Sequence, residues 1–354
     1  MKKTLIVGAV LTAFTAVAGA QQAQPASSVT LYGIMDANIA KSETHAGATV
    51  TGMDELPNPR GSRFGFRGSE NLGGGLRGIF QLEAGLSAKD GTTTANNQLF
   101  NRHAWVGLAG GFGELTVGRQ DTLHRTMNLS NYNDVATEGE LSVTTSNSGL
   151  QLMQNFGTRV NNAIRYTSPA FNGVRVRVQS ALGQRTTAST NGALVTYDKG
   201  PLRAALAYEY YDGAGVTGID RWNQATTVSG QYNLGFATVA LGYQWTDRLL
   251  ASAAANTLTS AASLPEHTAY NLGAIIPVSK ELSLRVQYTS STTKTPAVGT
   301  TAASSRDYSR TGVSARYAFS SRTFGYLAYN QRDVDLPTAG NNKSSLGLGI
   351  SHAF

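Results

Sequence analysis

The side chains with the clearest chemistry in this sequence are arginines that recur at every second position of short stretches. In residues 174–179, Arg175 and Arg177 alternate with valines, and Arg285 alternates in the same way with leucine and valine. A spacing of two places the guanidinium groups on one face of a β-strand and the apolar side chains on the other. A row of fixed positive charges concentrates anions beside it but makes no covalent bond.

No other group of reactive residues has a pattern typical of catalysis or metal binding. The five histidines are scattered without metal-ligand spacing, and the chain has no cysteine. The glycines at 73–75 are not followed by Lys and Ser or Thr, as a phosphate-binding loop requires, and no local Ser/His pair indicates a hydrolase. The arginines form no basic patch with stacked aromatics, so nucleic acid is not an expected partner. We expect no enzyme activity, no cofactor and no metal.

The N-terminus has the features of an export signal. Lys2 and Lys3 precede an apolar run at residues 5–17, which is followed by Ala-Gly-Ala at residues 18–20. The run is shorter than the about 20 residues that a membrane anchor needs. We expect residues 1–20 to be a cleaved signal peptide and residues 21–354 to be the mature chain, in which 27 basic and 22 acidic residues leave a formal charge of +5.

The elements that carry the arginines are predicted to be β-strands joined alternately by short and long connections. Seven short turns rich in Gly, Pro, Asn or Asp are expected at residues 70–75, 110–113, 169–173, 198–201, 233–235, 277–280 and 320–322. Eight longer polar stretches are expected at residues 41–61, 89–98, 121–160, 184–192, 213–221, 248–265, 294–307 and 333–342. Fifteen connections join sixteen strands. An even number of antiparallel strands with short turns at one end and long loops at the other is typical of outer-membrane barrels.

A barrel also fits the overall polarity of the chain. No uncharged apolar run after residue 17 approaches the length of a transmembrane helix. The mean hydropathy of -0.20 does not argue against a membrane, because lipid-facing and lumen-facing residues alternate in a barrel and average to mild polarity. A sandwich has the same local alternation, but open sheets rarely exceed about 10 strands, whereas barrels of about 16 to 18 strands leave an aqueous channel.

Two further patterns support a membrane barrel. In the last predicted strand, residues 346–354, Ile350, His352 and Phe354 share one face with two leucines, while the other face has small residues. Aromatic residues gather at the ends of predicted strands and suggest two belts at the membrane interfaces. The residues assigned to these belts are Tyr32, Trp105, Tyr166, Tyr197, Tyr243, Trp245, Tyr288, Tyr308 and Tyr317.

Five segments resemble the general-diffusion porins of Gram-negative bacteria, particularly those of the beta-proteobacterial branch. They are residues 29–37 (VTLYGIMDA), 61–76 (GSRFGFRGSENLGGGL), 100–108 (FNRHAWVGL), 113–120 (GELTVGRQ) and 164–169 (IRYTSP), together with the terminal Phe354. The resemblance implies a homotrimer of sixteen-stranded barrels in the outer membrane, in contact with lipid and lipopolysaccharide, that passes small hydrophilic solutes and anions passively. It also implies that Phe354, with His352 and Ile350, is a signal for the outer-membrane assembly machinery.

The alternation of the strands predicts a basic lumen. Charged side chains facing lipid would cost about 2–4 kcal/mol each near the midplane, so the lumen is the cheaper place for them. The arginines assigned to the lumen are Arg63, Arg67, Arg77, Arg102, Arg165, Arg175, Arg177, Arg203, Arg285 and Arg316, and the acids are Asp36, Glu83 and Glu209. Rings of arginine lower the barrier for anions relative to cations, so we expect anion preference.

The longest predicted loop, residues 121–160, exceeds an ordinary connection. The resemblance implies that this third loop folds into the barrel. Its acids Asp134, Glu138 and Glu140 are then expected to face Arg63, Arg102 and Arg165 across a constriction with a transverse field. Arg67 and Arg177 are further candidates on the wall.

Two other functions remain open from the sequence. A substrate-specific channel would need an ordered track of aromatic and charged groups, for which the cluster at residues 208–211 is the hint. An exported adhesin or structural β-protein would share the strand pattern without a channel. The short second loop at residues 89–98 is a candidate latch to a neighbouring subunit.

Overall fold

The computed structural model describes residues 27–53, 56, 61–95, 97–130, 158–182, 189–212, 222–247, 266–295, 297, 302–334 and 342–354. The expected signal peptide lies outside these ranges. Within them, no helix is long and apolar enough to cross a membrane.

The described residues form seventeen strands and one short helix. In chain order these are β1 (Ser28–Thr44), β2 (Thr49–Met53), β3 (Arg63–Gly73), β4 (Leu76–Gly85), β5 (His103–Gly110), β6 (Gly113–Asp121), α1 (Leu123–Leu129), β7 (Arg159–Thr167), β8 (Val174–Ala181), β9 (Ser189–Lys199), β10 (Leu202–Asp212), β11 (Trp222–Asn233), β12 (Thr238–Asp247), β13 (Glu266–Pro277), β14 (Leu282–Thr295), β15 (Ser304–Ala318), β16 (Thr323–Val334) and β17 (Asn342–Ala353).

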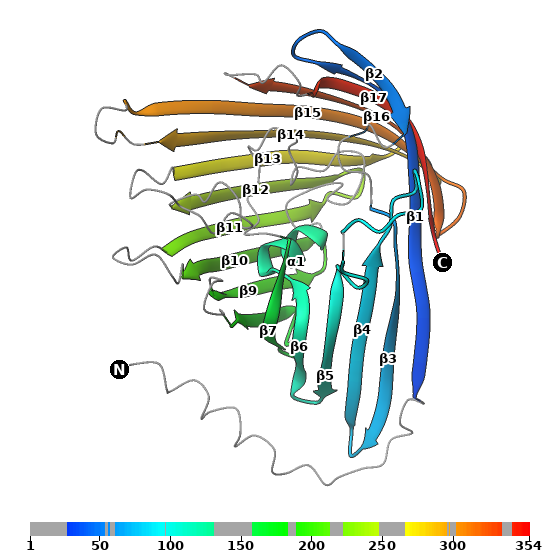
Figure 1. The fold of residues 1–354 in the computed structure, drawn as a ribbon, viewed down its shortest axis with the longest axis vertical. Helices are drawn as coiled ribbons and strands as arrows, with labels where there is room; N and C mark the ends of the chain where they lie inside the picture. The colour runs from blue at the N-terminus through cyan, green and yellow to red at the C-terminus, as the bar shows by residue number, and fades with distance from the viewer. Residues whose placement is uncertain are drawn as a thin grey trace.

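The strands close into an antiparallel ring. From β3 onward each strand pairs with the next in the chain, as the ribbons of β9 to β15 show in Figure 1, and β1 pairs with β17 on one side and β3 on the other. β2 pairs with the part of β1 beyond its contact with β3, so β2 and β3 share one place in the ring. The seventeen strands therefore fill sixteen places, and the prediction of a sixteen-stranded barrel is confirmed.

The seven short connections lie at the predicted turns, and all of them are at one end of the barrel. They are residues 74–75, 111–112, 168–173, 200–201, 234–237, 278–281 and 319–322. The first of these turns requires glycine, because Gly74 and Gly75 have φ angles of +58° and +81°, in the left-handed region that other residues rarely adopt.

Several long connections are shorter than the sequence predicts, and two of them are reduced the most. The predicted loop at residues 41–61 contains the end of β1, which runs to Thr44, and the whole of β2. The predicted loop at residues 294–307 is reduced because β14 reaches Thr295 and β15 begins at Ser304. In both places polar residues continue the backbone pairing past the apolar part of the strand, so local polarity marks the end of the apolar band and not the end of the strand.

The strands turn large apolar side chains outward and polar side chains into the ring. On β12, Leu241 faces out and is 60% exposed, whereas Gln244 faces in, is 1% exposed and donates a hydrogen bond to Thr227 Oγ1 at 2.8 Å. The same division holds around the barrel: large apolar residues, mainly Leu, Val, Ile and aromatics, are exposed on the other strands as well, whereas the buried residues include many Gln, Asn, Ser and Thr. An apolar exterior with a polar interior is the reverse of a soluble domain and is the arrangement that a membrane barrel requires.

The aromatic belts are only partly as predicted. Tyr243, Trp245, Tyr288 and Tyr317 are exposed on the outer face. Tyr32, Trp105 and Tyr308 instead point inward, because the strand register pairs them with inward-facing residues, and the prediction is wrong for these three. Tyr32 donates a hydrogen bond to Glu83 Oε2 at 2.9 Å inside the ring. Position near a strand end does not reveal the face on which a residue lies.

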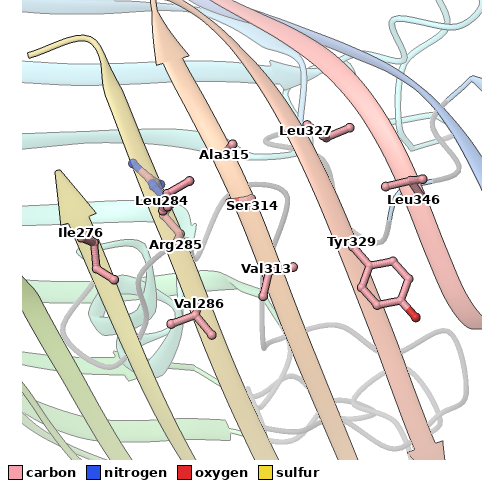
Figure 2. Close-up of a pocket in the computed structure, with 10 residues that line it drawn as sticks. All are labelled: Ile276, Leu284, Arg285, Val286, Val313, Ser314, Ala315, Leu327, Tyr329 and Leu346. Carbon is pink, nitrogen blue, oxygen red and sulfur yellow. The ribbon is translucent and has the colours of Figure 1, made fainter. Parts of the chain in front are cut away.

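The outer face has a shallow apolar groove across β13 to β17 (Figure 2). Its centre is Ala315, which lies directly opposite Leu284 on β14 and Leu327 on β16, so a methyl group sits between two longer side chains. The other apolar lining residues are Ile276, Val286, Val313, Tyr329 and Leu346. Because these side chains face away from the interior, the groove belongs to the apolar exterior and not to the channel.

The seam between β1 and the C-terminal residue has one close contact. Gly33 and Phe354 exchange two backbone hydrogen bonds of 3.1 Å each. The Phe354 ring lies over Gly33, where a Cβ atom would overlap it. The glycine therefore makes room for the terminal aromatic ring.

We expect Gly33→Val to weaken this seam, because the larger side chain must displace the Phe354 ring, and overpacking of this kind costs about 1–3 kcal/mol. The measurement is the temperature at which the folded, fast-migrating form is lost on a gel in detergent. Ala37→Val, on the same face of β1 and opposite Ile350, is the matched control. Adding Phe354→Ala should recover part of the loss, and an equal loss in the control would contradict the assignment.

Candidate pore constriction

The first residues of the long third connection lie inside the barrel. β6 ends at Asp121, and the following residues form α1 inside the ring (Figure 1). Leu123 and Met127 of α1 pack against Leu194 of β9 and against Ala205 and Ala207 of β10. These wall residues face inward, so the beginning of the loop lies against the inner surface and narrows the channel.

A buried carboxylate from the wall holds the helix in place. Glu209 on β10 accepts hydrogen bonds from the backbone N–H of Leu123 at 2.8 Å and of His124 at 2.9 Å. The Nδ1 atom of His124 lies 2.7 Å from the same carboxylate. A carboxylate at a helix N-terminus satisfies N–H groups that have no partner within the helix. Thr122 caps the helix as well, by accepting from the N–H of Arg125 at 3.2 Å.

Small residues on the wall make this arrangement possible. Gly192 lies directly opposite Glu209, and a Cβ atom there would be 2.6 Å from Cγ of Glu209. Ala205 and Ala207 leave space for the side chains of α1. The small residues of β9 and β10 thus leave the space on the inner wall that α1 and the carboxylate of Glu209 occupy.

Inward-facing arginines gather around two carboxylates of the wall, and the first of these is Glu83 on β4. Arg102 Nε lies 2.6 Å from this carboxylate and Arg63 Nε lies 3.7 Å from it. Tyr32 also donates to it, and Gln81 Nε2 donates to the Tyr32 hydroxyl at 2.6 Å. Arg63 lies opposite Gly85 on β4, two residues from Glu83 and on the same face, so the register of one hairpin creates the pair.

The second carboxylate is that of Asp121 at the end of β6. Arg159 Nε lies 3.0 Å from its carboxylate, and Arg165 Nη2 donates to its backbone oxygen. His103 Nε2 lies 3.4 Å from Asp121 and 3.9 Å from Glu83, so it links the two carboxylates. Arg165 is held further by Gln179 Oε1 at 2.7 Å. Four arginines and two carboxylates leave this constriction cluster with a formal charge of +2 when His103 is neutral.

The structure brings together the three arginines that were the strongest candidates from the sequence, Arg63, Arg102 and Arg165. Arg67 stands over the ring of Tyr32 at 5.3 Å and so adjoins the cluster. Arg177 is on the inner face but opposite Leu194, which packs against α1. The predicted loop acids Asp134, Glu138 and Glu140 lie outside the described residues.

Several residues of the wall are missing from the sequence prediction. The sequence predicts Asp121 and Arg159 at the ends of a loop, but they pair across β6 and β7. His103 matches no metal-ligand pattern, so the sequence gives it no role. Arg310 and Arg332 also face inward, on β15 and β16. Arg310 is an even number of residues from Arg316 on the same strand, and this spacing indicates from the sequence that both arginines face the lumen.

Two tyrosines of the aromatic cluster that suggested a substrate-specific channel, Tyr208 and Tyr210, do not line the lumen. Tyr208 is 37% exposed on the outer face, and its hydroxyl donates to Gln224 Oε1, which faces outward on β11. Tyr210 has the same orientation along β10, and its ring lies 6.2 Å from that of Tyr208. These tyrosines contact the surroundings of the barrel, so they supply no track for a substrate.

A closed ring of sixteen strands with an apolar exterior, a basic polar interior and a helix folded inward defines the class of outer-membrane barrel channels. The chain belongs to the Gram-negative porin family, whose sequence profile matches residues 9–336. It is an outer-membrane porin, and members of this family are passive channels and not enzymes. Family membership also excludes the soluble adhesin that the sequence left open.

The relatives agree with the resemblance seen in the sequence. Outer membrane porin protein 32 of Delftia acidovorans is 35% identical over 251 residues, which cover 68% of each chain. An outer membrane porin protein of Bordetella pertussis is 30% identical, and the match covers 69% of each chain. The solved anion-selective porin from Comamonas acidovorans is 27% identical with a TM-score of 0.71, over 93% of this chain and 100% of that one. The fold is also that of OmpT of Vibrio cholerae, solved in a trimer form, which is 15% identical with a TM-score of 0.67 over 93% of this chain and 100% of that one.

We expect Glu209→Gln to loosen α1, because hydrogen bonds to a charged group contribute about 1.5–3 kcal/mol and the amide retains only part of this. The expected result is an increase of about tenfold in the frequency of conductance steps in single-channel recordings. Asp198→Asn, which removes an inward carboxylate paired with Arg203 at 2.7 Å, is the control. Equal noise in this control would show that α1 is not held by Glu209.

Proposed function

We propose that this porin is an anion-preferring general-diffusion channel whose selectivity is set by Arg63, Arg102, Arg159 and Arg165. The observation that carries the proposal is the charge of the constriction cluster, which has two carboxylates for four guanidinium groups. The similarity to a solved porin described as anion-selective supports it.

The proposed mechanism is electrostatic. The carboxylates of Glu83 and Asp121 hold the arginines at fixed places, so the positive charge does not move away as an ion passes. A unit charge about 4 Å from an ion changes its energy by about 1 kcal/mol even in water, and more near a protein wall. An anion that loses part of its hydration shell beside the guanidinium groups is compensated by them, whereas a cation is repelled.

The proposal includes the opposite side of the constriction. Asp134, Glu138 and Glu140 of the third loop would face the wall arginines and create a transverse field that orients polar solutes. The inward position of α1 supports this, because it starts the loop inside the ring. Arg67 and Arg177 would extend the basic wall along the channel.

We further propose the assembly of the protein. Residues 1–20 would be removed on export, and residues 21–354 would form a homotrimer in contact with outer-membrane lipid and lipopolysaccharide, with the second loop at residues 89–98 as the latch between subunits. The trimer form of a solved porin with the same fold supports this. Phe354, with His352 and Ile350 on the outer face of β17, would be read by the barrel assembly machinery.

The selectivity proposal predicts changes of opposite sign. In planar bilayers under a potassium chloride gradient, the wild-type reversal potential should favour chloride. Arg102→Gln should lower the chloride-to-potassium permeability ratio, and Glu83→Gln should raise it, each by about fivefold, which corresponds to about 1 kcal/mol. Lys280→Gln, in the β13–β14 turn, is the control for a change of charge away from the constriction. A wild-type potential that favours potassium would refute the proposal.

The assembly proposal predicts that Phe354→Ser lowers the yield of folded trimer in cells more than it lowers refolding in detergent, because recognition by the assembly machinery acts only in cells. The yield is measured as the heat-modifiable band in outer-membrane fractions. Phe236→Ser, which replaces an aromatic residue 73% exposed before β12, is the control. Equal losses in cells and in detergent would mean that Phe354 contributes packing alone.

A further inference from the structure

A second group of arginines faces the interior on the other side of β1. Arg310 on β15 and Arg332 on β16 are directly opposite each other in register. They are 3% and 5% exposed. The strands β17 and β1 separate them from β3, where the constriction cluster begins. This pair is therefore a separate place on the wall.

The environment of the pair is polar but does not neutralise Arg332. Both Nη1 and Nη2 of Arg332 are buried and make no hydrogen bond to any residue that the structure describes. Arg310 donates from Nε at 3.2 Å and from Nη2 at 2.6 Å to Asn330 Oδ1, which is uncharged. The Tyr308 hydroxyl, on the same face of β15 and 2% exposed, is also buried and has no hydrogen-bond partner among the described residues.

Acidic residues of these strands are on the other face. Asp307 lies opposite Thr292 and Asp333 lies opposite Ser309, and both positions alternate with the inward-facing arginines. On β1, Asp36 faces inward, but its carboxylate accepts a hydrogen bond from the Tyr326 hydroxyl at 2.8 Å. Asp36 and Phe324 pair with the same residue of β17, and Phe324 is eight residues before Arg332 on β16, so Asp36 is far from Arg332 along the sheet. Within the described residues, no ion pair involves Arg332.

This arrangement is costly without a ligand. Directly opposite residues on antiparallel strands have Cβ atoms about 5 Å apart, and like charges at such positions are destabilising. A buried guanidinium without a partner costs more still. An oxyanion between the two arginines would relieve both costs, because a guanidinium presents paired N–H donors that match a carboxylate or a phosphate. The hydroxyl of Tyr308 would donate a further hydrogen bond.

We propose that Arg332, Arg310 and Tyr308 form an oxyanion-binding subsite on the inner wall of β15 and β16, which takes the carboxylate or phosphate group of a small solute. The inference deepens the proposed anion channel and rests on it, since anions must enter the lumen to reach the subsite. The subsite would retain oxyanions in the lumen and favour them over chloride, which cannot accept two parallel hydrogen bonds from one guanidinium in the same geometry.

The test is the block of single-channel chloride current by oxyanions. Full-length protein in planar bilayers carries current in potassium chloride while potassium phosphate, or in a second series potassium succinate, is added at constant ionic strength. We expect half-block at a concentration about tenfold higher for Arg332→Gln than for the wild type, as loss of a charge-assisted hydrogen-bonding partner predicts. Arg332→Lys, which retains the charge but not the planar group, should give a smaller shift in the same direction.

Two controls keep the result specific. Lys294→Gln removes a positive charge from the exposed face at the long-loop end of β14 and should leave the block unchanged. If Arg332→Gln does not fold, Tyr308→Phe replaces only the hydroxyl and should shift the half-block about threefold, as one lost hydrogen bond predicts. Tyr329→Phe, on the outer face (Figure 2), is the matched control for this change and should shift nothing.

The outcomes separate the subsite from the channel itself. A response to phosphate alone, or to succinate alone, would support the subsite and identify which oxyanion it takes. Equal half-block in the wild type, Arg332→Gln and Tyr308→Phe would overturn the subsite, even if the reversal potential still favours chloride. A wild-type potential that favours potassium would refute the proposed anion preference, while a shift in phosphate block between the wild type and Arg332→Gln would still show the subsite.

Discussion

The constraint on which this structure depends is that every backbone N–H and C=O group in an apolar environment must find a partner within the protein. A sheet has unpaired groups along its edges, and only closure removes them. β1 provides the closure, because it pairs with β17 along one edge and with β3 along the other. The two hydrogen bonds between Gly33 and Phe354 complete the pairing at the very end of the chain.

Closure has a direct consequence for the interior. Since side chains alternate along a strand, a ring with an apolar exterior must place its remaining residues inside, and in this chain many of them are arginines. Their charge is only partly balanced. Glu83 and Asp121 hold the arginines of one wall in fixed positions, and Glu209 holds the helix that narrows the channel. The interior therefore combines rigid geometry with an excess of positive charge, which are the two conditions for selective passage of ions.

The barrel could be predicted because its signals are local. Turn residues and the spacing of two identified all seven turns, the number of strands and the inward face of Arg63 and Arg165. Arg102 lies just before β5 and contacts Glu83, although a spacing of two from the inward-facing His103 would not place it on that face. The errors arose where an aromatic residue was assigned from its position near a strand end and not from its spacing to inward-facing residues. Tyr32 and Tyr308 are an even number of residues from Asp36 and Arg316 on the same strands, and they face inward with them. Polar residues in the loops were not predicted to extend β1 or form β2, because strand pairing there depends on a neighbour.

By itself, the sequence determined the class of fold, the alternation of polar and apolar faces along the strands and the sign of the charge in the lumen, because each follows from residue type and spacing along a single strand. The tertiary structure decided which charges meet. The contacts between Arg102 and Glu83, between Arg159 and Asp121, and between Glu209 and α1 join residues on different strands or elements. Such contacts depend on the register and closure of the whole ring, which no local pattern specifies.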